Sequence, residues 1–179
     1  MVIYTKGGDK GKTSLYSQTK KKRRVLKDSL RINAIGGIDE ANSFLGVVVA
    51  FSNPRKLKGE IAEIQKDLLT IGSMLAGSSL KLSPDRTKHF EKTIDLIDAK
   101  LLVLANFILP GGGKIGSLLH YTRTLVRRAE RGIVALNKKE KVDPEIIKYI
   151  NRLSDLLFML ARHENHKEGK KEKLWTSKS

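Results

Sequence analysis

The sequence contains no cysteine among its 179 residues, which excludes disulfide bonds, thiolate metal sites and cysteine nucleophiles. Its four histidines are too scattered to form a metal-ligand pattern, and no serine lies in a nucleophile elbow. The chain also offers no pair of residues suited to general acid and base catalysis. Its polar and basic side chains suit the positioning and electrostatic stabilisation of a bound group, not nucleophilic attack by the protein.

Long apolar runs are missing as well. No stretch approaches the roughly eighteen apolar residues of a membrane-spanning helix, and the polar N-terminus has no signal-peptide core. We therefore expect a cytoplasmic protein that does not bind a membrane. A length of 179 residues is enough for a single domain, 1–179, with a sizeable core.

Positive charge is abundant: 35 Lys and Arg against 19 Asp and Glu give a formal net charge of +16. Residues 1–27 alone hold nine basic residues and only one acidic residue, Asp9. Two explanations stay open, a polyanionic partner such as nucleic acid and the charge-rich composition of a heat-adapted protein. The KKKRR run at 20–24 favours a solvated basic loop over a nucleic-acid contact, because no recognition helix, zinc motif or aromatic platform accompanies it.

Only four prolines interrupt the chain. Three of them follow Asn53, Ser83 and Asp143, which are residue types that cap helices, and Pro110 opens the glycine run PGGGKIG. Apolar residues recur at helical spacing in the five segments between these breaks, 30–51, 57–79, 85–106, 115–137 and 144–163. We predict an all-α five-helix bundle over 30–166, preceded by a glycine-rich and lysine-rich segment, 1–29. The charged tail, 167–179, is expected to fray, with Trp175 as the residue that could dock.

The N-terminal segment contains the glycine-rich motif YTKGGDKGKTSL at residues 4–15. Gly7 and Gly11 bracket one residue too few for a Walker phosphate loop, and no alternation of strand and helix follows, so we reject that class of nucleotide fold. The motif still combines glycines, whose backbone N–H groups can converge, with side-chain donors to phosphate oxygens. Phosphate binding and a flexible basic N-terminus both stay open.

A basic stretch, RTLVRRAERG, lies at residues 123–132. Arg123, Arg127 and Arg131 fall within an arc of about 80° on a helix, so they share one face. A solvated face, a nucleic-acid contact and an anionic small-molecule site are the three explanations. Two further polar faces, around Asp39 in 36–46 and around Asn151 in 149–166, are ordinary surface stripes or parts of a site, and the pattern alone favours the former.

Six blocks in this order resemble the PduO-type ATP:cob(I)alamin (corrinoid) adenosyltransferases. They are YTKGGDKGKTSL, RVLKDSLRINAIGGIDEANSFLG, IQKDLLTIGSMLA, FILPGGG, RTLVRRAERG and YINRLSDLLFMLAR. The resemblance implies a cobalamin adenosyltransferase-like, ferritin-like five-helix bundle that forms a homotrimer with active sites between subunits. It also implies transfer of the 5′-deoxyadenosyl group of ATP to cob(I)alamin, which releases triphosphate and forms adenosylcobalamin.

The resemblance further implies roles for individual residues. Phe107 would occupy the lower face of the corrin ring and displace the axial ligand of cobalt. Arg123 would pair with Asp39 across the subunit interface. Mg²⁺ would bind through the ATP phosphates and not at a dedicated protein site. The residues implied to bind ATP are Thr5, Lys6, Gly7, Gly8, Thr13, Ser14, Lys27, Arg127, Arg128, Glu130, Arg131 and Asn151.

Two other functions remain as alternatives to this enzyme. One is a non-catalytic carrier that binds ATP or adenosylcobalamin, and the other is a basic helical nucleic-acid-binding protein. For the enzyme, the implied partners are ATP and a reduced corrinoid, together with a corrinoid reductase and an adenosylcobalamin-dependent acceptor enzyme.

Overall fold

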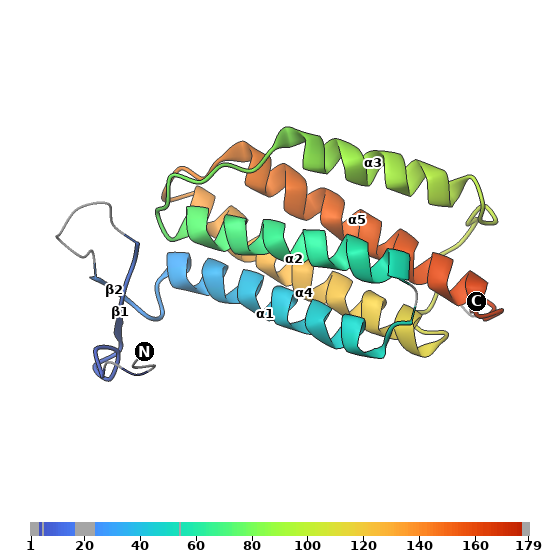
Figure 1. Ribbon diagram of the computed structural model, residues 1–179, viewed down its shortest axis with the longest axis horizontal. Coiled ribbons are helices and arrows are strands. Elements are labelled where there is room, and N and C mark those ends of the chain that lie inside the picture. The colour runs from blue at the N-terminus through green and yellow to red at the C-terminus, as the bar shows by residue number, and fades with distance from the viewer. Residues whose placement is uncertain (1–3, 5, 17–23, 54, 177–179) are drawn as a thin grey trace.

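The computed structural model describes residues 4, 6–16, 24–53 and 55–176. Its helices are α1 (Leu30–Phe51), α2 (Arg55–Leu75), α3 (Pro84–Asp98), α4 (Lys114–Asn137) and α5 (Pro144–Lys167). This architecture confirms the predicted all-α five-helix bundle. A short antiparallel hairpin of β1 (Lys12–Ser14) and β2 (Arg24–Leu26), which the sequence did not predict, lies beyond the end of the bundle where α1 begins (Figure 1).

Each helix buries one stripe of apolar residues in a common core. The stripe of α1 consists of Ala34, Ile38, Ala41, Leu45 and Val48, as its helical spacing predicts. α4 lies against both α1 and α5. A Cβ at Gly37 of α1 would lie 3.1 Å from the Cα of Ala129 in α4, so glycine allows the two backbones to approach closely. This contact holds the basic stretch of α4 beside the polar face of α1.

Two of the predicted helix caps are present. Ser83 accepts a hydrogen bond from the Asp85 N–H at 3.3 Å, and Asp143 accepts one from the Glu145 N–H at 3.0 Å. Each cap is followed by proline at the first helical position, where the missing N–H costs nothing. Pro54 lies outside the described residues.

The prediction that the third helix reaches residue 106 is wrong. α3 ends at Asp98, and residues 99–113 form an irregular segment that leads to α4. The Leu102 carbonyl accepts a hydrogen bond from Arg162 of α5 at 2.8 Å instead of closing another helical turn. Val103 is 94% exposed, so the apolar spacing continues here without a core to bury it.

The tail does not fray over residues 168–176. The Leu109 N–H donates to the Lys173 carbonyl at 2.8 Å, and the Trp175 N–H donates to the Phe107 carbonyl at 2.7 Å. Residues 173–175 therefore run antiparallel to 107–109, joined by the bridge between Ile108 and Leu174. The docking of Trp175 is confirmed, and the fraying expected for this part of the tail is wrong.

Among the described residues, α1 is long and apolar enough to cross a membrane by length and composition, although no such segment was expected from the apolar runs of the sequence. Core helices of folded domains pass the same test. The buried stripe of α1 faces α2 and α4. This packing identifies α1 as a helix of the bundle core.

Candidate active site

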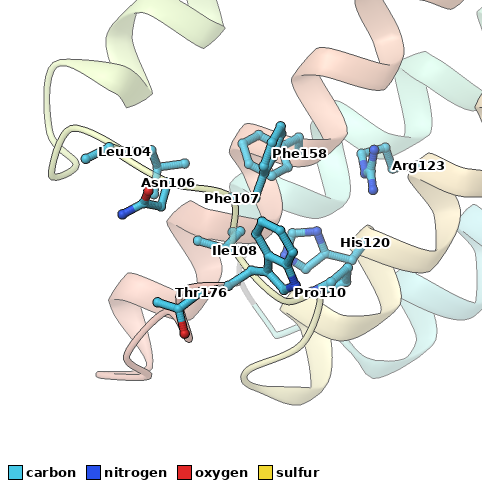
Figure 2. Close-up of a pocket in the computed structure, with 11 residues that line it drawn as sticks. Leu104, Asn106, Phe107, Ile108, Pro110, His120, Arg123, Phe158 and Thr176 are labelled. Carbon is cyan, nitrogen blue, oxygen red and sulfur yellow. The ribbon is translucent and has the colours of Figure 1, made fainter. Parts of the chain in front are cut away.

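A cavity of about 940 Å³ opens between the segment 99–113, α4, α5 and the C-terminal segment. Phe107 lines it with its side chain 80% exposed. Phe158 of α5 and His120 and Arg123 of α4 line it as well, and Figure 2 shows these side chains turned toward one space. The aromatic rings and the adjacent guanidinium suit a large flat ligand that also carries polar groups.

A second hollow of about 320 Å³ adjoins this cavity, since both are lined by Arg123 and Phe158. The second hollow adds Arg127, Arg152 and Asp155 to its lining. Asp155 is paired with Arg152 at 2.7 Å, so Arg123 and Arg127 contribute positive charge that this carboxylate does not neutralise. An aromatic cavity thus continues into a basic one, which suits a ligand that joins an extended ring to an anion.

Arg123 stands at the junction of the two hollows. Its guanidinium carbon lies 6.0 Å from the centre of the Phe158 ring, a cation–π distance. Burial and the neighbouring Arg127 charge lower its pKa from the ordinary value. Among the described residues Arg123 has no carboxylate within ion-pair distance, and its buried Nε has no hydrogen-bond partner. A half-buried cation in this state calls for an anionic partner from outside the chain.

His120 occupies the neighbouring turn of α4. His120 is buried, and the centre of its ring lies 5.8 Å from the centre of the Phe158 ring. Neither ring nitrogen of His120 has a hydrogen-bond partner among the described residues. Burial, with a smaller contribution from the Arg123 charge, lowers the pKa of His120 below its ordinary value. This shift favours the uncharged imidazole, which presents a polar edge to the cavity.

The charged side chains of the basic stretch of α4 have different interaction partners. Arg128 forms an ion pair with Glu40 of α1, and Glu130 accepts a hydrogen bond from Asn151 Nδ2 at 3.0 Å. Arg131 donates to the Arg127 carbonyl at 3.1 Å, and both of these side chains are exposed. The structure thus brings Asn151 to this stretch, and it leaves Arg127 and Arg131 free of carboxylate partners among the described residues.

Asp39 and Arg123 do not meet within one chain. Asp39 is exposed on α1 and has no cation within ion-pair distance among the described residues. The neighbouring Glu40, which also belongs to the Asp-Glu pair of the sequence motif, takes Arg128 instead. The single chain thus leaves both members of the predicted pair without a charged partner, and the prediction of a pair between subunits stays a prediction.

The N-terminal hairpin folds the glycine motif against Lys27. The Lys27 N–H donates to the Gly11 carbonyl at 2.9 Å, and a Cβ at Gly8 would lie 3.0 Å from Lys27 Nζ. Arg24 donates to the carbonyls of Gly7 and, at 3.1 Å, Lys12. Gly11 has a φ of 69°, a conformation that glycine adopts without strain. The Lys27 ammonium group thus lies beside the glycines of the motif, where it could bind an anion.

The other described residues that were predicted to bind the ATP phosphates lie on either side of this turn. Lys6 precedes it with a φ of 55°, and Thr13 and Ser14 lie on β1. Thr5 lies outside the described residues. The hairpin adjoins the N-terminal end of α1, whereas the cavity with Phe107 lies toward the opposite end of the bundle, where α4 begins (Figure 1). One chain therefore does not bring the predicted phosphate loop and the aromatic cavity together.

Sequence reasoning did not single out several residues of the site. Neither Phe158 nor His120 is among the residues that the sequence predicts for the site. Arg24, which fixes the glycine turn, was read as part of a solvated basic run. The signal for Phe158 was available, because an aromatic residue on the face opposite the leucines of an amphipathic helix is only partly buried by the core.

Fold and site together define a helical-bundle protein with adjoining aromatic and basic hollows, which suit a large ring and an anion. The model of the cobalamin adenosyltransferase family matches residues 3–164. The chain belongs to this family.

Individual relatives agree with this assignment. The corrinoid adenosyltransferase of Bacillus subtilis is 42% identical over 177 residues, covering 94% of this chain and 89% of that protein. The human corrinoid adenosyltransferase is 37% identical over 185 residues, covering 97% of this chain and 72% of its own length. A phenylalanine-to-alanine variant of the PduO-type ATP:corrinoid adenosyltransferase from Lactobacillus reuteri, complexed with cobalamin and ATP, superposes with a TM-score of 0.93 at 36% identity. That comparison covers 98% of this chain and 100% of the other.

Proposed function

We propose that this protein is an ATP:cob(I)alamin adenosyltransferase, which transfers the 5′-deoxyadenosyl group of ATP to the cobalt of a reduced corrinoid. The carbon–oxygen bond at C5′ breaks, a bond between C5′ and cobalt forms, and triphosphate leaves with the electron pair of the broken bond. The observation that carries this proposal is the aromatic cavity joined to a basic hollow through Arg123 and Phe158, in a chain of the cobalamin adenosyltransferase family. The corrinoid is the nucleophile, so the protein needs no nucleophilic side chain.

Phe107 is the residue best suited to act on the corrinoid. Its ring is exposed at the cavity, and its backbone carbonyl is held by the Trp175 N–H at 2.7 Å. An apolar ring against the lower face of the corrin excludes water and side-chain donors from the cobalt. Without a lower ligand, Co(II) is easier to reduce to the Co(I) state that attacks ATP.

Donors suited to the ATP phosphates lie in two places, the N-terminal turn and the basic stretch of α4. The turn formed by Gly7, Gly8 and Lys27 offers backbone and ammonium donors, and Lys6, Thr13 and Ser14 adjoin it. Arg127 and Arg131 are exposed and free of carboxylate partners among the described residues. These donors would bind the triphosphate and stabilise the charge that develops as it leaves.

The distance between the hairpin and the cavity supports a site shared between subunits. Residues of the hairpin of one subunit would complete the cavity of the next, and a closed homotrimer provides three such sites. Asp39 and Arg123, each unpaired within the described chain, would then pair across the interface. Losing either member would leave a partly buried charge without its partner.

This pairing has a direct test by charge reversal. Asp39→Arg and Arg123→Asp should each weaken trimer formation and lower activity, and the double variant should recover part of both. Analytical ultracentrifugation and steady-state assays of the three variants measure these effects. Wild-type assembly and activity in both single variants would contradict the pairing.

Mg²⁺ is expected to arrive with ATP. Among the described residues no group of three or more His, Asp or Glu side chains could hold a metal ion, so the phosphate oxygens are the natural ligands. Mg²⁺ would shield the triphosphate and help it leave. A cytoplasmic location, a reductase, an acceptor enzyme and a heat-adapted composition stay predictions of the sequence, and cell fractionation and thermal unfolding test the first and the last.

Anaerobic incubation with ATP, Mg²⁺ and chemically reduced cobalamin tests the reaction. The expected result is a light-sensitive cobalt–carbon bond and one triphosphate for each adenosylcobalamin formed. Tight binding of ATP and adenosylcobalamin with no product would favour the carrier alternative. Neither binding nor product would contradict both.

A further inference from the structure

Phe107 lies on an irregular segment of the chain, 99–113, that is long for a loop within a compact domain. Because its ring is 80% exposed, packing of the ring itself does not fix its position. The proposed chemistry, however, needs the ring at one place against the corrin. Other contacts must therefore hold the segment.

Arg162 of α5 holds the first end of this segment. Its side chain is only 3% exposed, and its Nη2 donates to the Leu102 carbonyl at 2.8 Å. The same guanidinium binds Glu172 of the tail through Nε at 2.7 Å and Nη2 at 3.2 Å. These three hydrogen bonds from one buried guanidinium tie the segment and the tail to one point of α5.

Asn165, one helical turn further along α5, holds the second end. Its side chain is also 3% exposed. Its Nδ2 donates to the Gly111 carbonyl at 2.8 Å, and its Oδ1 accepts from the Gly113 N–H at 2.9 Å. The amide thus pairs with both backbone groups that flank Gly112, whose φ is 109°.

The glycines of the PGGGKIG motif leave room for this amide. A Cβ at Gly112 would lie 2.5 Å from the Asn165 side chain, and a Cβ at Gly116 would lie 2.0 Å from its Oδ1. Real atoms do not approach this closely, so any side chain at these positions would displace Asn165. The glycine run is therefore shaped to fit a side chain of α5.

We propose that Arg162 and Asn165 are positioning residues that hold both ends of the Phe107 segment and thereby set the place of the ring against the corrinoid. Phe107 lies between the two anchored points, Leu102 and Gly111, and the tail that Arg162 fixes through Glu172 bonds to the Phe107 backbone. Neither residue lines the aromatic cavity. The proposal rests on the proposed function, because it assigns Arg162 and Asn165 an effect on that reaction through Phe107.

The variants Asn165→Ala and Glu172→Gln test the two anchors. The first removes both amide hydrogen bonds, and the second keeps the shape of the tail residue while removing its charge. Each should lower the turnover of cob(II)alamin in the presence of a reductant by about tenfold, while the KM for ATP changes less than about twofold. The fraction of bound cob(II)alamin without a lower ligand, measured by electron paramagnetic resonance, should fall in parallel.

Tyr149→Phe provides the matched control. Tyr149 is another buried polar residue of α5, and its hydroxyl donates to Asp67 at 2.9 Å, away from the segment. This variant should lower thermal stability without changing the fraction of cob(II)alamin that lacks a lower ligand. Arg162→Lys, which keeps the charge but cannot make all three contacts, should retain more activity than Arg162→Ala.

The fluorescence of Trp175 provides a second measurement of how the tail is held. Trp175 is the only tryptophan of the sequence, and its backbone N–H donates to the Phe107 carbonyl. Iodide should quench its fluorescence more strongly in Glu172→Gln than in the wild type while the far-ultraviolet circular dichroism is unchanged. This measurement needs no corrinoid, and it also applies if Asn165→Ala fails to fold.

Two failures are distinguishable. An inactive wild-type protein would contradict the proposed function. The positioning role alone would be overturned if the wild type is active and both Asn165→Ala and Glu172→Gln keep its turnover. The two variants would also have to keep the wild-type fraction of bound cob(II)alamin without a lower ligand.

Discussion

Two glycine-rich turns stand at opposite ends of this molecule, and they use glycine for opposite purposes. Around Gly11, apart from its chain neighbours, no atom of the described residues comes within 4 Å of a Cβ placed there. A Cβ at Gly8 would meet the flexible end of Lys27 at 3.0 Å and the Lys12 carbonyl oxygen at 3.9 Å. At Gly112 and Gly116, by contrast, the Asn165 amide occupies the space that a side chain would need. The space beside the first turn is open, as the proposed binding of an anion requires, and the space beside the second is filled by the protein itself. Glycine content alone therefore does not identify a binding loop.

The largest effect should follow from a change at the filled end. Phe107→Ala should lower the turnover of cob(II)alamin by about a hundredfold, because the lower face of the corrin then admits a ligand to cobalt. The KM for ATP should change less than about twofold, since ATP is proposed to bind at the other turn. Steady-state assays with each substrate varied in turn measure this split. Equal losses for both substrates would show that the two ends do not have separate roles.

The next largest effect should be on the free energy of unfolding, which a substitution of glycine should change more at the filled turn than at the open turn. Gly116→Ala should lower the free energy of unfolding by about 2 kcal/mol, because the new methyl group displaces Asn165 and leaves buried backbone groups unpaired. Gly8→Ala should change it by less than about 0.5 kcal/mol, because only the end of the Lys27 side chain has to move. Urea unfolding of both variants measures the difference. Similar losses in the two variants would contradict the distinction between a filled and an open turn.

A change at the open turn should affect the KM for ATP. Lys27→Ala should raise the KM for ATP by about tenfold, the size expected for one charge-assisted hydrogen bond to a phosphate. Turnover at saturating ATP and the KM for the corrinoid should change little. Lys170→Ala, which removes an exposed charge of the tail, is the control for a general loss of positive charge. An equal rise in the KM for ATP in both variants would assign the effect to net charge and not to the turn.

The sequence predicts the helices well because their signals are local. Ser83 and Asp143 cap helices through hydrogen bonds within two residues, and the stripe around Ile38 follows from spacing alone. The end of α3 was missed because Leu102 bonds to a residue sixty positions away. Asn165 was missed for the same reason, since its partners lie more than fifty residues before it in the sequence.

In the candidate site too, some features follow from local sequence and others depend on distant contacts. The resemblance to a family identifies Arg123 and Asp39 as partners, but no single chain brings them together. Phe158 and His120 join the cavity only once α4 and α5 are packed side by side. Local patterns can thus locate basic and aromatic residues, whereas the partner of each one depends on the packing of helices or of subunits.

The smallest effect concerns the pH dependence of stability. Burial lowers the pKa of His120 in the folded protein below the ordinary value of about 6.5 that it has in the unfolded chain. The unfolded state therefore binds the proton more readily, and stability should fall as the pH drops below about 6.5. His120→Gln should weaken this decline, although His163, whose pKa burial also lowers, should leave part of it. Thermal unfolding between pH 7.5 and about pH 5 measures both slopes, and identical slopes would show that His120 titrates alike in the folded and unfolded states.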